Sequence, residues 1–260
     1  MSAEVEDAPE EQGLIQHLLE LRTRLMRSIL AVFIAFVGLF PFREWLYSEL
    51  AKPLVSHLPH GGHLIATEVS SPFFTPIKMA AVMALMLAMP VVIYQMWAFV
   101  SPGLYRHEKR LARPLLVSAV ALFYIGCAFA YFLVMPAAFR FLTAVTPQGV
   151  EMMTDINHYL SFVLTLFFAF GICFEVPVAV VILAAIGVLP VKKLRSSRPY
   201  VLVVVFILAA VLTPPDIMSQ LMLGIPMYLL YEGGILAAAL LLRNKSGAEQ
   251  DQDGEDAGEA

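Results

Sequence analysis

The sequence has 260 residues, of which 59% are hydrophobic and only 15% are charged, and its mean hydropathy is +0.76. Soluble domains are about 45–50% apolar and about 25% charged, so this composition excludes a disordered chain, a nucleic-acid-binding module and an ordinary soluble enzyme. The net charge of −4 arises at the two ends, because eleven of the 21 acidic residues lie before Gln12 or after Ala248. The remainder is mildly basic, as in a protein that holds its lysines and arginines at one membrane surface.

The first region, residues 1–13, is acidic and is predicted to be disordered. Residues 14–26 carry an apolar stripe at helical spacing, which indicates an amphipathic helix that lies on the membrane surface. Within it, Glu20 and Arg24 are four residues apart, and their simplest interpretation is a solvated ion pair.

Six apolar segments follow, and each is predicted to be a membrane helix. Their approximate bounds are residues 28–42, 79–100, 115–139, 159–189, 200–213 and 217–242. The first lacks a small-residue cleavage site after it, so we interpret it as a retained span and not as a cleaved signal peptide. The acidic tail, residues 246–260, is low in complexity and is predicted to be disordered.

The fifth segment is shorter than a normal span. Its 14 residues cover about 21 Å as a helix, whereas about 20 residues are needed to cross about 30 Å of hydrocarbon. Pro214 and Pro215 then end the helix, so the fifth and sixth segments should form a tight hairpin. The hairpin either re-enters on the same side or crosses a locally thinned bilayer.

The basic residues predict the orientation. Of the 17 lysines and arginines, 13 lie before the first segment, in loops 101–114 and 190–199, or after the sixth segment. This bias places both termini in the cytoplasm. The outer loop, residues 43–78, contains four prolines including Pro53 and an apolar stretch at 45–50, which predicts a structured cap over the outer face.

The sequence lacks recognisable catalytic motifs. It has no phosphate-binding G-x-x-x-x-G-K-[ST] loop, no H-E-x-x-H pair and no nucleophile motif. His57, His60 and His63 could form a weak metal site, but a polar loop is the better interpretation. Cys127 and Cys173 lie in apolar runs, so we expect buried thiols. No cofactor, metal or enzymatic activity is predicted, and the chain is expected to work by binding and rearrangement.

Three acidic residues lie within or beside apolar sequence. Glu175 is in the middle of the fourth segment, where charge is costly and therefore suggests a function. The alternative is a structural hydrogen bond to a neighbouring helix, but Pro177 nearby interrupts the helical ladder and favours a functional site. Glu232 is equally consistent with snorkelling or a structural pair, and Asp216 with a turn cap or a functional group.

A further acid, Glu108, lies in the basic loop between the second and third segments. Such a lone glutamate is usually paired with its basic neighbours. The functional alternative is a carboxylate held at the membrane surface, where it can accept two parallel hydrogen bonds from an arginine.

Five short motifs resemble those of one protein family. They are H-L-L-E-L-R at 17–22, S-P-F-F at 71–74, W-A-F-V-S-P-G-L-Y at 97–105 with His107-Glu108, F-E-V-P at 174–177 and L-T-P-P-D at 212–216. In this order, over residues 14–242, they resemble TatC, the membrane receptor family of the twin-arginine protein translocase.

The resemblance implies six helices in a cupped bundle, with both termini inside and the last two helices short. It also implies binding of twin-arginine signal peptides on folded precursors, and their transport across the cytoplasmic (inner) membrane. The implied partners are TatA and TatB in an oligomeric complex, and the implied energy source is the proton-motive force.

The resemblance also assigns roles to residues. Glu20, Phe99 and Glu108 would bind the signal peptide. Glu175 would make an intramembrane polar contact. Thr213 and Gln220 would face TatB or TatA. Apart from the resemblance, Asp216 and Pro53 are interpreted from their loop positions as structural or capping residues.

Two other functions are weighed against a translocase receptor. A proton-coupled solute transporter could use Glu175 and Glu232, but transporters usually contain more spans and an internal repeat, which is not detectable here. An intramembrane enzyme would need a nucleophile or a paired carboxylate motif, which this sequence lacks.

Overall fold

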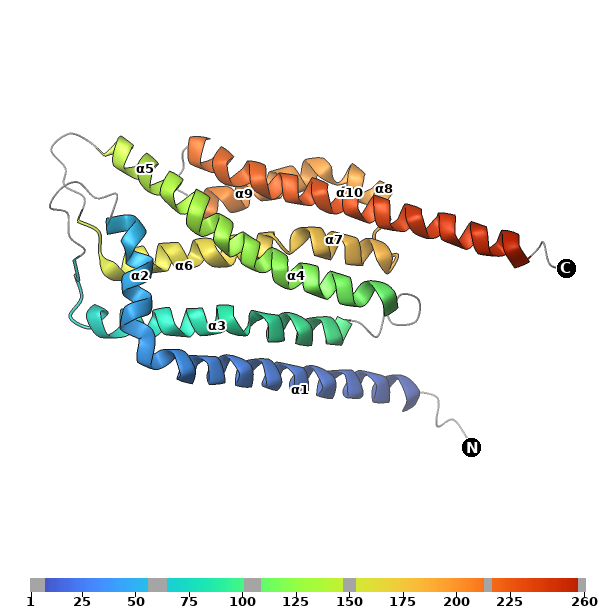
Figure 1. Ribbon diagram of the computed structural model, residues 1–260, viewed down its shortest axis with the longest axis horizontal. Helices are drawn as coiled ribbons and strands as arrows, with labels where there is room; N and C mark the ends of the chain where they lie inside the picture. The colour runs from blue at the N-terminus through green and yellow to red at the C-terminus, as the bar shows by residue number, and fades with distance from the viewer. Residues whose placement is uncertain (1–7, 56–64, 101–108, 147–152, 213–216, 257–260) are drawn as a thin grey trace, which may run out of the picture. The chain divides into compact units, whose positions relative to one another are not determined.

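The computed structural model describes residues 8–55, 65–100, 109–146, 153–212 and 217–256 (Figure 1). Every named element in these ranges is a helix, and five helices are long and apolar enough to cross a membrane. The predicted all-α membrane fold is therefore confirmed. The chain divides into two compact units, one formed by Met1–Lys52 with Ala66–Leu116 and the other by Pro53–Ile65 with Val117–Ala260.

The first unit is built around two long helices that lie side by side (Figure 1). They are α1, Ala8–Leu39, and α3, Ser71–Val100. Between them come a 3-10 turn, Phe40–Phe42, and α2, Arg43–Val55. Leu46, Leu50 and Ala51 of α2 are buried, so residues 43–55 of the loop predicted to be structured form a short helix.

Helix α1 corrects two predictions. Residues 8–13 are helical instead of disordered, and the surface helix and first span, predicted separately, form one uninterrupted helix. No residue between Ala8 and Leu39 forces a break, because Pro9 occupies the first turn, where its missing N–H has no cost. Once the apolar part is helical, each added residue extends it without a new nucleation step.

The second unit contains the remaining helices. Its first part comprises most of α4, Lys109–Phe129, a π-helical stretch at Ala130–Val134, and α5, Met135–Val145. The π-helical stretch ends two residues before Pro136, which cannot donate a backbone hydrogen bond. The third predicted span therefore consists of three consecutive helical pieces.

The fourth predicted span also divides, into α6, Ile156–Cys173, and α7, Val176–Ala185. Asp155 caps α6 by accepting hydrogen bonds from the backbone N–H groups of the first turn at 2.8 and 3.1 Å. Beside this cap, Ile65 pairs with the backbone of Thr154 and Ile156, which ties the segment before α3 to the start of α6.

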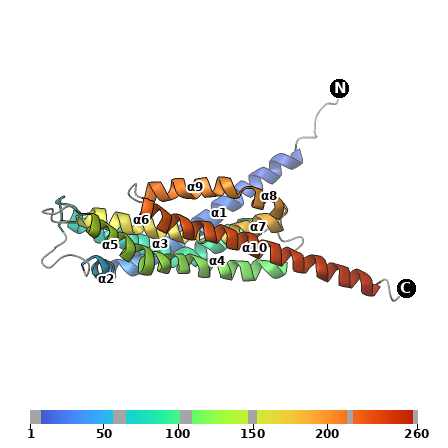
Figure 2. The ribbon, with the colours of Figure 1, turned by 90° about the horizontal axis from the view of Figure 1, so that it is seen from above.

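The last three helices pack together, as Figure 2 shows. They are α8, Val191–Ser196, α9, Arg198–Leu212, and α10, Ile217–Asp256. Helix α9 has 15 residues, and the apolar part of α10, Gln220–Leu241, has 22, fewer than the other four candidate spans. The last two apolar segments are thus the shortest, as expected.

Helix α10 itself corrects a prediction, since it continues to Asp256 through residues that were expected to be disordered. Residues 246–256 contain one alanine, two glutamates and two glutamines, which favour a helix, but also three aspartates and two glycines, which do not. The segment extends an existing helix and so needs no nucleation.

Candidate functional site

The pairing of α1 with α3 brings His17 against Phe99. The two rings stack with their centroids 4.2 Å apart and an interplanar angle of 23°. Phe99 lies in the last turn of α3, and Glu20 lies one turn after His17 on α1. Two of the three predicted signal-peptide residues, Glu20 and Phe99, are therefore at the same end of this helix pair.

Glu20 is paired with Arg24, as its spacing predicted. Oε1 of Glu20 accepts hydrogen bonds from Nε and Nη2 of Arg24 at 2.9 and 2.5 Å. The side chain of Glu20 is 37% exposed and that of Arg24 is 21% exposed, so other groups can reach the pair. A guanidinium group that approaches Glu20 must share the carboxylate with Arg24 or displace it.

Gln95 is a polar residue that the sequence reasoning missed. It lies one turn before Phe99 on α3 and is only 8% exposed. Within the part of the chain that the structure describes, its Oε1 atom is buried without a hydrogen-bond partner. A buried acceptor without a partner costs about 1–3 kcal/mol, so Gln95 offers an acceptor to a donor that enters beside Phe99. An amide within the apolar stretch 79–100 was the available signal.

Several predicted site residues lie outside the described ranges. They are Glu108, Thr213 and Asp216, together with His57, His60 and His63. Pro53 is part of α2, but its side chain is also outside the description. Among the residues that are described, no group of three or more histidine, cysteine, aspartate or glutamate side chains could hold a metal ion.

Glu175 lies at the break between α6 and α7. Pro177 follows in the first turn of α7 and has no N–H to donate to the carbonyl of Cys173. Among the described atoms, Oε1 of Glu175 is buried and has no hydrogen-bond partner. The break therefore presents a carboxylate within an apolar span that can accept a hydrogen bond from another group.

Glu232 has both carboxylate oxygens engaged. Nη2 of Arg198 lies 2.6 Å from Oε2, and the hydroxyl of Tyr228 donates to Oε1 at 2.9 Å. Nearby, the buried hydroxyl of Tyr231 donates to the carbonyl of Leu194 at 2.8 Å. These contacts join α10 to α8 and α9 and identify the structural pair as the correct alternative for Glu232. Glu232 is therefore not available as the second acid that a transporter based on Glu175 and Glu232 would need.

Gln220 makes a contact inside the α9–α10 hairpin. Its Nε2 atom donates to the carbonyl of Phe206 at 3.0 Å. Part of its hydrogen-bonding capacity is therefore used within the chain.

Cys127 and Cys173 are free, half-buried thiols.

The comparison with protein families gives a match over residues 16–226, to the family described as Sec-independent protein translocase protein (TatC). The protein of that name from Azotobacter chroococcum is 51% identical over 245 residues, which cover 94% of this chain and 96% of that one. The TatC protein of Escherichia coli K12 is 54% identical over 224 residues, which cover 86% of this chain and 87% of that one.

A solved structure is also similar. The crystal structure of a twin-arginine translocase receptor TatC superimposes with a TM-score of 0.76 and 38% sequence identity, covering 86% of this chain and 98% of that one. The family match, the relatives and this structure agree along most of the chain. The chain therefore belongs to the TatC family of Sec-independent protein translocase proteins and is a multi-pass membrane protein.

Proposed function

We propose that this chain is the receptor subunit of a twin-arginine translocase in the inner membrane. It binds the paired-arginine signal peptides of folded precursors at its cytoplasmic face. With TatA and TatB it supports their transport across the membrane, driven by the proton-motive force. Both termini lie in the cytoplasm, in accord with the distribution of lysine and arginine along the sequence.

The observation that best supports this proposal is the stack of His17 on Phe99. It holds together the end of α3 and the part of α1 that carries Glu20. Phe99 supplies apolar shielding and Glu20 supplies an acceptor. Glu108, nine residues after Phe99 in the basic loop, supplies the second carboxylate for an arginine pair.

The free energies explain why shielding matters. A fully exposed ion pair contributes only about 0.2–1 kcal/mol, which is too little to select a precursor. Loss of one partner of a desolvated, hydrogen-bonded pair costs about 2–5 kcal/mol, or roughly 30-fold to several thousand-fold in affinity. Arginine suits such a site better than lysine, because its planar fork matches the two oxygens of a carboxylate.

The intramembrane residues are proposed to serve assembly. Glu175 has a buried carboxylate oxygen without a hydrogen bond in the described structure. In the proposed complex this oxygen accepts a hydrogen bond from a helix of TatB or TatA. Thr213 and Gln220 contribute to the face of the hairpin that receives TatB or TatA. The short α9 supports local thinning of the bilayer at this face.

The decisive experiment is site-specific crosslinking of a twin-arginine precursor to membranes that contain each variant. Glu108→Ala should abolish the crosslink, and Glu20→Ala should weaken it less, because it shares one arginine. A matched control is Glu44→Ala, which removes an exposed carboxylate on α2. A precursor whose arginine pair is replaced by two lysines should not crosslink to the unmodified chain.

Two results would contradict the proposal. One is normal crosslinking by Glu108→Ala. The other is equal crosslinking of the two-lysine precursor, which would show attraction to negative charge instead of recognition of arginine.

A further inference from the structure

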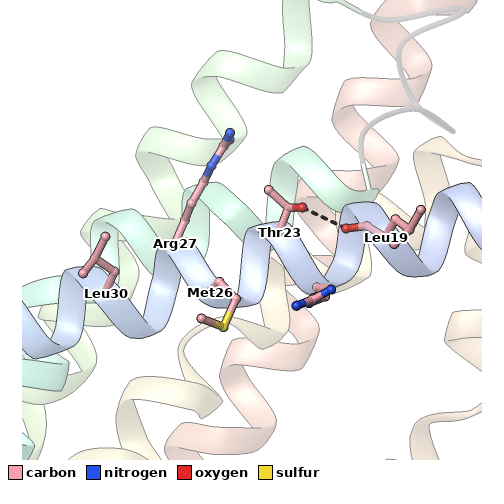
Figure 3. A pocket seen from close by; sticks show the side chains of 6 residues that line it. Leu19, Thr23, Met26, Arg27 and Leu30 are labelled. Atoms are coloured by element: carbon pink, nitrogen blue, oxygen red, sulfur yellow. Dashed lines mark hydrogen bonds between the residues drawn. The ribbon is translucent and has the colours of Figure 1, made fainter.

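Helix α1 has an open groove along one face (Figure 3). The described residues that line it all belong to α1 and recur at helical spacing: Leu19, Arg22, Thr23, Met26, Arg27 and Leu30. The hydroxyl of Thr23 donates to the carbonyl of Leu19 at 2.9 Å, so this polar group is already satisfied. The groove therefore combines an apolar floor with two arginines.

The two arginines of the groove are exposed and have no ion-pair partner among the described residues. Arg24, three residues before Arg27, is instead paired with Glu20. Arg22 and Arg27 are five residues apart, which is about 7.5 Å along the helix axis and about 140° around it, so they lie at opposite edges of the groove. This spacing suits one anionic group placed between two flexible guanidinium side chains.

Beyond Arg27, the same side of α1 is an exposed apolar surface. Met26, Leu30 and Ile34 follow one another at four-residue spacing, and each is more than half exposed. No residue in the most apolar stretch of α1 is fully buried. The surface runs for about 18 Å from Arg27 to the end of α1, which is enough for one acyl chain in a leaflet about 15 Å deep.

We propose that this groove binds an anionic phospholipid. The phosphate lies between Arg22 and Arg27, and one acyl chain packs along Met26, Leu30 and Ile34. Charge complementarity favours a lipid over a helix of a second copy or partner. An apolar helix would cover the floor but leave two guanidinium groups unpaired, whereas a phosphate accepts charge-assisted hydrogen bonds from both. Basic residues at a membrane surface are attracted to anionic lipids.

The test uses the full-length chain with a photoreactive amino acid in place of Leu30, reconstituted in phosphatidylcholine vesicles that contain a minority of phosphatidylglycerol. Lipid adducts are identified by mass spectrometry. We expect phosphatidylglycerol adducts well above its mole fraction, and a loss of this enrichment at high salt. The double variant Arg22→Gln/Arg27→Gln should lower the enrichment by up to about thirty-fold, at about 1 kcal/mol per basic residue.

The matched control is Lys192→Gln/Lys193→Gln, which removes two exposed charges from α8 and should leave the enrichment unchanged. Three outcomes would overturn the proposal: adducts in proportion to mole fraction, an equal loss in the lysine control, or adducts mainly with a second copy of the chain. The salt titration uses unmodified arginines, so the test does not depend on the folding of the double variant.

Discussion

Gly234 permits a close approach between α10 and α7. A Cβ atom at this position would lie 2.8 Å from Cα of Pro177 and 3.1 Å from Cβ of Val180. Since the first of these atoms is backbone, Gly234→Ala must push the helices apart by about 0.6 Å to reach an ordinary contact of 3.4 Å. Pro177 adjoins the break that carries Glu175, so the displacement should reach that carboxylate.

The adjacent Gly233 is a matched control, because a Cβ atom there would meet nothing within 4 Å. Both substitutions gain about 1 kcal/mol from the higher helix propensity of alanine. Only Gly234→Ala adds the cost of overpacking, which is about 1–3 kcal/mol. The propensity gain cancels in the comparison, so Gly234→Ala should be less stable than Gly233→Ala by about 1–3 kcal/mol.

The assay is thermal unfolding of the two purified variants in the same detergent, alongside export of a twin-arginine reporter in cells. We expect Gly233→Ala to match or exceed the original protein in both measurements. Gly234→Ala should unfold at a lower temperature and export less. Equal unfolding temperatures for the two variants would refute the inferred contact between α10 and α7.

Three further predictions follow from the sites. Glu175→Leu removes a buried acceptor without a partner in the described structure, so it should leave the protein inserted and at least as stable but reduce reporter export; normal export would remove Glu175 from the functional site. Arg24→Gln frees the carboxylate of Glu20 and should strengthen precursor crosslinking about twofold, the equivalent of an exposed pair of about 0.3–0.5 kcal/mol. Weaker crosslinking would instead assign Arg24 to positioning Glu20. Asp155→Ala should lower the free energy of unfolding by about 1 kcal/mol through loss of the α6 cap, whereas Asp155→Asn should retain most of it; equal melting temperatures would contradict the cap.

Predictions from apolar length succeeded best. The positions of the long apolar helices and the shortness of α9 follow from composition alone, because the hydrocarbon thickness sets the required length. Helix ends were less predictable. Both the start of α1 and the end of α10 extend through polar sequence, since a helix that already exists propagates into residues that could not begin one.

The candidate site was predictable in part. The spacing of Glu20 and Arg24 on one helix was enough to predict their ion pair. The partner of Phe99 was not, because His17 is distant in sequence and meets it only through the packing of α1 against α3. The same holds for Gln95, whose burial depends on neighbours that no local pattern specifies.

The sequence by itself determined the class of this protein, the number and order of its apolar segments, and the break at Pro177, because these depend on composition, length and local backbone chemistry. Only the tertiary structure decided what each polar group meets. It paired Glu232 with Arg198 and Tyr228, and left an oxygen of Glu175 without a partner among the described residues. Both acids lie in similar apolar surroundings along the chain. Their difference arises from which helices pack together, and side-chain contacts between distant segments exist only after that packing has formed.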